Sequence, residues 1–227
     1  MIINVLQHAP NEGPGSIQKW AQMHHYDFYV YHPAQFGILP EAKETDFLVI
    51  LGSPMSPNDR EPWIEKERTL IKELIAANKP IFGVCFGAQQ IVKTLGYRVL
   101  KAPVKEVGWA PVNLMSNLIP GLPEQLNVLH WHEEMFEIPR AAKLLYSSEH
   151  VTNQGFILPS NIVGLQFHLE PLKENVNEIV VNDAAYLTGS VLNQNPKEVL
   201  ENAIPAANQE AMFKILDFIC KKKAKSN

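Results

Sequence analysis

The sequence is poor in cysteine, with only Cys85 and Cys220 among 227 residues. Two cysteines do not suggest a disulfide framework or a cysteine-rich zinc cluster. The chain also lacks an apolar run near the ~20 residues that span a bilayer, and Met1 to Pro10 has no basic and apolar secretory signal. These absences predict a protein with no membrane segment in a reducing compartment, the cytoplasm.

Positive charge is also scarce, because 20 Lys and Arg face 24 Asp and Glu, for a net charge of −4. Binding to nucleic acid phosphates needs clustered Lys and Arg, so no nucleic-acid partner is expected. The basic run at 221–225 is interpreted as a solvated tail that complements a helix C-terminus. The length of 227 residues, with 46% apolar residues, fits one α/β domain over 1–227.

The first half of the chain alternates short apolar runs with helical periodicity. Strands are expected at 2–6, 28–31, 46–51 and 80–84, and helices at 16–25, at 61–78 and after Cys85. Strands separated by helices form a parallel sheet with helices on both faces. Ligands in such folds collect at the carboxyl ends of the strands. The loops after Leu6 and Leu51 and the segment around Cys85 should open at that edge.

The second half has a different pattern. Short, turn-bounded apolar segments predict added antiparallel strands at 97–100, 109–115, 127–131, 144–147, 155–158 and 162–167. Helices are expected again at 173–182, 196–202 and 206–222, the last with Cys220 as a core thiol. The predicted fold class is therefore α/β, with a flavodoxin-like, open, mostly parallel central sheet, helices on both faces and additional antiparallel strands.

Cys85 is placed where a predicted strand turns sharply into a helix. Gly83 and Gly87 flank it at minus two and plus two, where a Cβ would collide with the tight turn. This spacing is typical of a nucleophile elbow, with Cys in place of Ser. The helix N-terminus favours thiolate over thiol. A buried structural cysteine at a glycine-bounded strand end is the alternative interpretation.

A second apolar run, 164–170, contains His168 and Glu170 and ends before Pro171. If this run is a strand, side chains two residues apart point to the same face. The Glu170 carboxylate can then hold one imidazole nitrogen of His168 while the other faces outward. A cysteine on an elbow with such a pair is the nucleophile, base and orienter set of covalent catalysis.

The segments Gly83-Val84-Cys85-Phe86-Gly87-Ala88-Gln89 and Phe167-His168-Leu169-Glu170 resemble the class I glutamine amidotransferases. The likeness is strongest to stand-alone members related to the glutaminase part of GMP synthase. This resemblance implies a Cys85-His168-Glu170 triad that hydrolyses the glutamine side-chain amide through a γ-glutamyl thioester and releases ammonia. It implies no cofactor.

The resemblance also assigns residues around the triad. The oxyanion hole would use the backbone N–H of Phe86, the residue after the nucleophile, and that of Gly52 in a loop resembling the family's Gly-Gly-x-Met-Ser segment. Ser53 there departs from the family glycine. Gln89 would bind the substrate α-carboxylate, and Ser53, Trp131 and His132 would line the glutamine pocket. Glu133 and Glu134 replace the Gly-Asp of the family's His-Trp-His-Gly-Asp segment.

Three nearby features carry no expected chemistry. His130 and His132 beside Glu133 have a superficial look of metal ligands, but no third ligand is evident, so no metal site is expected. The segment Lys105-Glu106-Val107-Gly108-Trp109 resembles another family segment without a chemical role. His8 and Glu12 are expected at surface or hinge positions of a loop near the catalytic rim.

Several functions stay open from the sequence. The leading one is glutamine hydrolysis, with ammonia passed to a partner synthetase or simply released, since no synthetase follows in the chain. The same triad fits a hydrolase of γ-glutamyl peptides or conjugates. A non-enzymatic binding or regulatory module is a third interpretation, which the presence of all three catalytic residue types opposes. Another family with a cysteine on an elbow would not predict the Phe-His-x-Glu segment.

Overall fold

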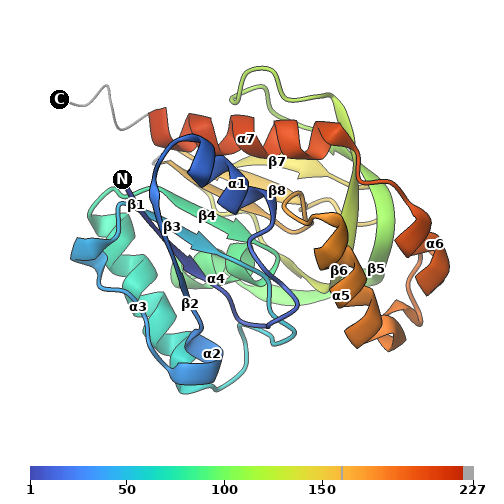
Figure 1. Cartoon of the computed structure of the whole chain (residues 1–227), viewed down its shortest axis with the longest axis horizontal. Helices are drawn as coiled ribbons and strands as arrows, with labels where there is room; N and C mark the ends of the chain where they lie inside the picture. Colours follow the sequence, from blue (N-terminus) through green and yellow to red (C-terminus); the bar gives the residue numbers. More distant parts are fainter. Residues whose placement is uncertain (160, 222–227) are drawn as a thin grey trace.

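A nine-stranded sheet forms the centre of the computed structural model, which describes residues 1–159 and 161–221 (Figure 1). Its strand order is β2-β1-β3-β4-β9-β8-β7-β5-β6. The strands are β1 (Ile2–Leu6), β2 (Asp27–Tyr31), β3 (Phe47–Ile50), β4 (Ile81–Val84), β5 (Val99–Leu114), β6 (Gln125–Phe136), β7 (Lys143–Ser147), β8 (Gly155–Leu158) and β9 (Ile162–Leu165).

Helices connect the strands of the first half and return after β9. They are α1 (Ser16–Met23), α2 (Pro33–Phe36), α3 (Pro62–Ala76), α4 (Phe86–Thr94), α5 (Lys173–Asp183), α6 (Pro196–Glu201) and α7 (Ala206–Lys221). Two short 3-10 helices are η1 (Ala42–Glu44) and η2 (Ala184–Leu187).

The sheet has a parallel half and an antiparallel half. Strands β2, β1, β3, β4 and β9 pair in parallel, whereas β9, β8, β7, β5 and β6 pair in antiparallel fashion. β4 and β9 lie next to each other in the sheet, although the chain between them forms α4 and all of the strands from β5 to β8. The predicted α/β class, with antiparallel strands added to a parallel core, is confirmed.

Helices cover both faces of the parallel half. On one face α1 and α7 lie side by side (top of Figure 1) and bury Ile17, Trp20, Ile215 and Leu216 against the sheet. On the other face α3 and α4 bury a second apolar cluster, formed by Leu70, Ile71, Leu74, Ile91 and Val92 with sheet residues. Each such side chain contributes roughly 1.5–3 kcal/mol by leaving water. The two clusters fix the sheet, and with it the strand ends that carry the site.

The antiparallel half differs from the sequence prediction most clearly in its longest strand. The expected short strands at 97–100 and 109–115 belong to a single long strand, β5, which pairs with β6 along most of its length and has an irregularity between Lys101 and Glu106. Pro103 lies in that irregularity, and Pro111 lies further along the same strand. Proline normally argues against a ladder position, and Pro103 lies between the two predicted segments.

β9 is shorter than predicted. It ends at Leu165, so His168 and Glu170 lie beyond the strand and not within it. The physical reason is the end of its neighbour: β4 pairs with β9 up to Val84 opposite Leu165, and the chain then leaves the sheet at Cys85. The prediction that His168 and Glu170 share a regular strand face is wrong.

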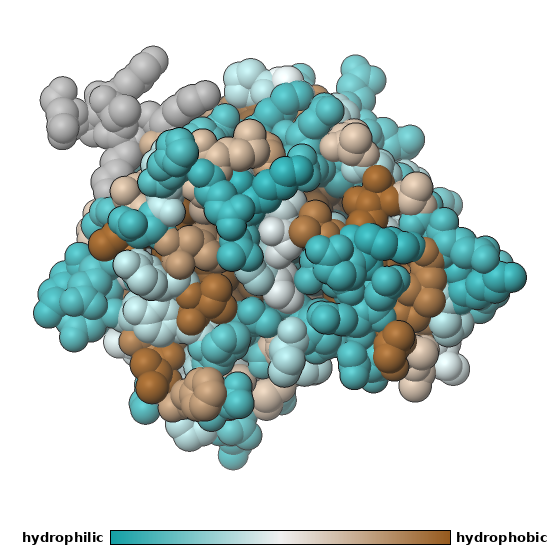
Figure 2. All heavy atoms as spheres, in the orientation of Figure 1, coloured by the Kyte–Doolittle hydropathy of each residue, from teal (hydrophilic) through white to brown (hydrophobic). Residues whose placement is uncertain are grey.

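Three further expectations concern the surface and the C-terminus. Cys220 packs against the apolar cluster under α7, as predicted for a core thiol. The basic run at 221–225 falls almost entirely outside the described residues. Among the helices that the structure describes, none combines the length and apolar character needed to cross a membrane. Side chains on the face in Figure 2 are mostly hydrophilic, with hydrophobic residues in small separate groups.

Candidate active site

Cys85 occupies a strained turn between β4 and α4. Its backbone has φ 50° and ψ −108°, a conformation that costs a non-glycine residue about 1–3 kcal/mol. Glycine is required on both sides: a Cβ on Gly83 would lie 2.6 Å from the carbonyl carbon of Gly87, and one on Gly87 would collide with the carbonyl of Ile50. The predicted strand–turn–helix geometry around Cys85 is therefore present, and the sulfur stands at the carboxyl end of the sheet.

His168 is buried next to Glu170. The Nδ1 atom of His168 lies 2.6 Å from Oε1 of Glu170, whose Oε2 accepts the backbone N–H of Leu169. Because a carboxylate only accepts, Nδ1 carries the proton and Nε2 is the atom available to the sulfur. The pair is close even though the segment is not a regular strand.

Backbone contacts from two distant elements hold this segment in place of a strand ladder. The N–H of His168 donates to the carbonyl of Leu129 in β6, at 2.9 Å, and the N–H of Ser16 at the start of α1 donates to the carbonyl of Glu170, at 2.8 Å. Gly15, with φ 47°, lets the chain approach that carbonyl, since a Cβ there would collide with it. The His168–Glu170 pair is thus positioned by β6 and α1.

The thiol of Cys85 is close to His168 and to two other polar groups. Burial opposes the charged form of His168, but Glu170 and a hydrogen bond with Cys85 outweigh it and raise the pKa of His168 well above its usual value. The sulfur also lies 3.5 Å from Nε2 of Gln166 and 3.9 Å from the carbonyl oxygen of Trp131. An imidazolium next to the sulfur favours the thiolate, the nucleophilic form.

Gln166 was not expected from the sequence, and it connects two predicted positions. Its Nε2 donates to the sulfur of Cys85, and its Oε1 accepts from Nε2 of Gln89, at 3.1 Å. Gln89 is 3% exposed and lies one turn into α4. The sequence placed Gln166 only within an apolar run, and its role depends on the parallel pairing of β9 with β4.

A cleft of about 480 Å³ opens at Cys85. The predicted residues Ser53, Gln89, Trp131 and His132 all line it. Its opposite wall comes from α5 and η2, and Nε1 of Trp131 donates to Oδ2 of Asp183 there, at 3.0 Å. The full lining is Asn11, Glu12, Ser53, Pro54, Met55, Ser56, Cys85, Gln89, Trp131, His132, Glu133, Glu134, Ile179, Asn182, Asp183 and Tyr186.

A hydrogen bond from His8 holds the loop after β3 in place. The His8 side chain is fully buried, with Nδ1 3.1 Å from the carbonyl oxygen of Gly52 and Nε2 2.9 Å from Oε2 of Glu67. Both partners only accept, so both ring nitrogens donate and the ring is an imidazolium. Burial lowers the pKa of His8, but Glu67 and Gly52 outweigh burial and raise it. The expected surface or hinge position of His8 is wrong.

Glu12 is half-buried at the cleft. It lines the cleft, and its carboxylate lies so close to Gly52 that a Cβ on that glycine would collide with it. Removal from bulk water raises the pKa of Glu12, while His168 and His8 oppose that rise. Glu134, which replaces a family aspartate, accepts from Oγ of Ser56 at 2.8 Å and ties the same loop to β6.

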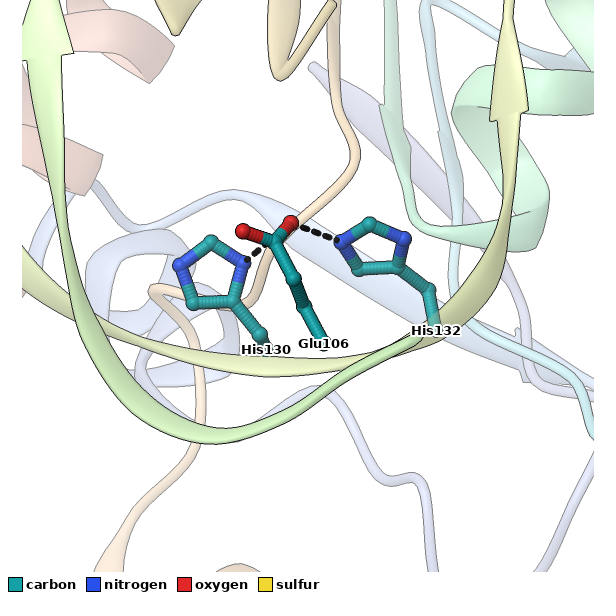
Figure 3. Close-up of side chains that lie close together, drawn as sticks. All are labelled: Glu106, His130 and His132. Carbon is teal, nitrogen blue, oxygen red and sulfur yellow. Dashed lines mark ion pairs between the residues drawn. The ribbon is translucent and has the colours of Figure 1, made fainter. Parts of the chain in front are cut away.

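The structure places an acidic side chain, as a third potential ligand, beside the two histidines of β6. Glu106 of β5 lies next to His130 and His132, with all three buried (Figure 3). The sequence-based argument that no third ligand lies near these histidines is therefore wrong. Only the register of β5 against β6, which pairs Glu106 with His132, could have revealed it.

The arrangement around the sulfur supplies a nucleophile, an imidazole base and a carboxylate that orients the base. It also presents the backbone N–H of Phe86 at the start of α4, directly after Cys85. The phenyl ring of Phe86 packs away from the cleft against Trp63 and Ile64. A site with these groups can attack a carbonyl carbon and stabilise the resulting oxyanion.

Comparison with known proteins places this site in a family. The sequence model of class-I glutamine amidotransferases matches residues 21–184. This chain therefore belongs to the class-I glutamine amidotransferase family, whose members are generally cysteine-dependent amidohydrolases.

Individual relatives differ in what their names say they do. A glutamine amidotransferase-like protein, YfeJ, of Salmonella typhimurium is 32% identical over 79% of this chain and 80% of its own. One of the subunits of the glutamine-hydrolysing GMP synthase of Saccharolobus solfataricus is 33% identical over 57% of this chain and 70% of its own. Gamma-glutamyl peptidase 4 of Arabidopsis thaliana is 28% identical over 82% and 76%.

A solved structure supports the same fold assignment. The glutamine amidotransferase of Methylobacillus flagellatus superimposes with a TM-score of 0.89 at 27% identity, over 96% of this chain and 94% of that one.

Proposed function

We propose that this protein hydrolyses the side-chain amide of glutamine, with Cys85 as nucleophile, His168 as general acid and base, and Glu170 as the group that orients His168. The observation that carries the proposal is the 2.6 Å contact between His168 and Glu170, which, together with the nearby Cys85, raises the pKa of His168. The whole chain, 1–227, serves as one amidotransferase domain, working in the cytoplasm, where a thiol nucleophile stays reduced.

The chemistry follows from these positions. The thiolate of Cys85 attacks the amide carbon, and the carbonyl π electrons move onto oxygen. The tetrahedral species collapses when the C–N bond breaks and His168 protonates the leaving nitrogen, which departs as ammonia. A γ-glutamyl thioester remains. Water, deprotonated by His168, then attacks the thioester carbon, and the C–S bond breaks to give glutamate and the regenerated thiol.

The oxyanion hole is assigned to the backbone N–H of Phe86 and to the loop after β3. The sequence points to Gly52 as the second donor. The Gly52 carbonyl accepts from His8, and in a trans peptide the next N–H points the opposite way. That N–H belongs to Ser53, which lines the cleft with Cys85. The geometry therefore favours the backbone N–H of Ser53, the residue after Gly52, as the second donor. Loss of such a donor typically costs ~10²- to 10³-fold in turnover.

Substrate contacts are assigned to the cleft wall. Gln89 presents an amide one turn from Cys85 and is held by Gln166, which suits it to the α-carboxylate of glutamine. Trp131, His132 and Ser53 line the same space. The mechanism draws on no cofactor. Ammonia released here would pass to a synthetase partner, and one relative is named as a subunit of a glutamine-hydrolysing GMP synthase.

Hydrolysis of γ-glutamyl peptides is a second candidate function. It uses the same triad and differs only in the leaving group, and one relative covering 82% of this chain is named a gamma-glutamyl peptidase. The cleft volume of about 480 Å³ exceeds what a glutamine side chain needs. A larger amine could occupy the space between the loop after β3 and α5.

Two assays test the proposal. Ammonia release from glutamine and cleavage of γ-glutamyl dipeptides are measured on the wild-type protein and on Cys85→Ala, which should be inactive on both. A diazo-ketone analogue of glutamine should leave one adduct, on Cys85, detected by mass spectrometry. Labelling mainly at Cys220 would contradict the assignment of the nucleophile, and peptide cleavage without glutamine hydrolysis would select the second function.

A further inference from the structure

Glu106, His130 and His132 converge on one point between β5 and β6 (Figure 3). The strand register pairs Glu106 with His132 and Gly108 with His130, so the three side chains project from the same face of the hairpin. Exposure is 0% for Glu106 and His130 and 2% for His132. Buried groups of this kind are rare unless paired or bound to a metal.

Oε2 of Glu106 is the centre of the cluster, because it faces both imidazole rings. It lies 3.2 Å from Nε2 of His132 and 3.7 Å from Nδ1 of His130. On the other ring nitrogen, Nδ1 of His132 lies 2.9 Å from the carbonyl oxygen of Glu134. That carbonyl can only accept, so Nδ1 carries a proton and the neutral ring has its lone pair on Nε2.

A neutral His132 ring would therefore point a lone pair at a carboxylate oxygen. Two acceptors 3.2 Å apart repel each other unless a positive charge lies between them, as a proton or as a metal ion. A backbone carbonyl that fixes one nitrogen while the other faces a cation is the usual outer contact of a metal-bound histidine.

His130 shows the same need for a partner. Neither of its ring nitrogens makes a hydrogen bond of normal geometry, although the ring is completely buried. An unpartnered buried nitrogen costs about 1–3 kcal/mol. A ligand at Nδ1, which faces Glu106, would remove that cost.

We propose that Glu106, His130 and His132 bind one divalent transition-metal ion of the zinc class. Two imidazoles and a carboxylate are a ligand set that zinc accepts, at about 2.0–2.2 Å per ligand. Tetrahedral coordination places ligand atoms roughly 3.4 Å from one another. The ligand atoms here lie within 4.8 Å of one another, two of the pairs at 3.2 and 3.7 Å. Small side-chain rotations close the third pair.

A fourth ligand is available at the same place. Nε2 of Gln154 lies 2.6 Å from Oε2 of Glu106 and 3.4 Å from Nε2 of His132, and the Oε1 atom of Gln154 has no hydrogen-bond partner. Rotation of this amide would turn Oε1 toward the ion, and water is the alternative ligand. The ion can enter through the cleft, because His132 lines it.

The bound ion would lock the wall of the active site. It would join β5 to the segment of β6 that contains Leu129 and Trp131. The carbonyl of Leu129 accepts from the backbone N–H of His168, and the carbonyl of Trp131 faces the sulfur of Cys85. Its role is structural, because none of the three ligand side chains makes a hydrogen bond with Cys85 or His168. His132 also lines the cleft, but the inference does not depend on the proposed function, since metal binding is measured without substrate and none of the three ligands belongs to the triad.

The test measures metal binding directly. Tag-free protein is stripped with a chelator, loaded with Zn²⁺ or Co²⁺, passed over a desalting column and analysed for metal content. We expect one ion per chain, a higher melting temperature with Zn²⁺, and a Co²⁺ absorption spectrum of a four-coordinate nitrogen–oxygen site. X-ray absorption at the zinc edge should show imidazole ligands and no sulfur.

Variants locate the ion. Glu106→Gln and His130→Asn should each weaken Zn²⁺ binding by more than the roughly 10- to 100-fold that loss of an outer-shell partner costs. Cys85→Ala and His25→Asn, the latter on an exposed histidine, should bind like the wild type. Sulfur ligation, or loss of Zn²⁺ binding in Cys85→Ala, would overturn the proposal. Wild-type protein that retains no ion would also overturn it, because a proton on His132 would then lie between His132 and Glu106. The wild-type spectra decide even if a ligand variant does not fold.

Discussion

The Nδ1 atom of His168 lies 2.6 Å from Oε1 of Glu170, two residues along an irregular segment. The other carboxylate oxygen is held by the backbone N–H of Leu169. Glu170 therefore cannot rotate without losing a second hydrogen bond, and it fixes both the orientation of the imidazole and its proton on Nδ1. The same contact therefore controls both the orientation of the His168 imidazole and its charge.

Replacement of this carboxylate tests the coupling. In Glu170→Gln the ring loses the negative charge that supports its imidazolium form, and we expect turnover on the preferred substrate to fall by roughly 10²- to 10⁴-fold. KM should change much less, because Glu170 does not line the cleft. Glu174→Gln, on an exposed residue of α5, is the matched control. Equal turnover of the two variants would remove Glu170 from the mechanism.

The same pair predicts a pH dependence of stability. Glu170 and Cys85 outweigh burial and raise the folded-state pKa of His168 well above the unfolded value of 6.5. A raised pKa means that the native state holds its proton more tightly. The stabilisation is complete below pH 6.5, while Glu170 stays ionised, and disappears as the pH rises through the folded-state pKa.

Chemical denaturation across this range checks the sign. The difference in free energy of unfolding between the wild type and Glu170→Gln should be largest just below pH 6.5 and should shrink toward alkaline pH. A difference that grows with rising pH would mean that His168 is neutral when the protein is folded.

The sequence was sufficient for the elbow but not for what surrounds it. Glycines at 83 and 87 have one local explanation, the close approach of β4, α4 and β3, so a short motif identified the turn. His168 and Glu170 were paired for a partly mistaken reason, because β9 ends before them. The two side chains still meet, because β6 and α1 hold the segment through backbone hydrogen bonds.

Contacts across the sheet could not be predicted in the same way. Gln166 reaches Cys85 because β9 lies next to β4, and Glu106 meets His132 because of the β5–β6 register, which shifts between Lys101 and Glu106. A single sequence has no signal for such a register between two strands. The buried position of His8 has no local signal for a related reason: its partners, Gly52 and Glu67, lie 44 and 59 residues away.

The elbow predicts a difference between two glycines. Gly87→Ala would place a methyl group on the carbonyl of Ile50, where backbone must move, and we expect a loss of about 1–3 kcal/mol in the free energy of unfolding. Gly13→Ala meets only the Asn175 side chain at 3.5 Å and should change stability by less than about 0.5 kcal/mol. Urea titration of both variants measures this. Equal stability would show that α4 is not packed tightly against β3.

His8 offers the sharpest test of the loop that faces the thiolate. In His8→Asn the shorter side chain cannot reach Gly52 and Glu67 together, so the peptide between Gly52 and Ser53 loses its fixed orientation. If that peptide supplies an oxyanion donor, turnover should fall by about 10- to 100-fold, less than the ~10²- to 10³-fold for complete loss of a donor, with KM nearly unchanged.

The comparison with His25→Asn separates positioning from general destabilisation. His25 is exposed and has φ 54°, a conformation that asparagine adopts readily, so this control should keep wild-type turnover. Melting temperatures of both variants are measured alongside the kinetics. A folded His8→Asn protein with wild-type turnover would show that the hydrogen bond to Gly52 does not orient the oxyanion hole. A rise in KM at constant turnover would instead assign His8 to shaping the substrate pocket, because an oxyanion donor acts on the transition state and not on bound glutamine.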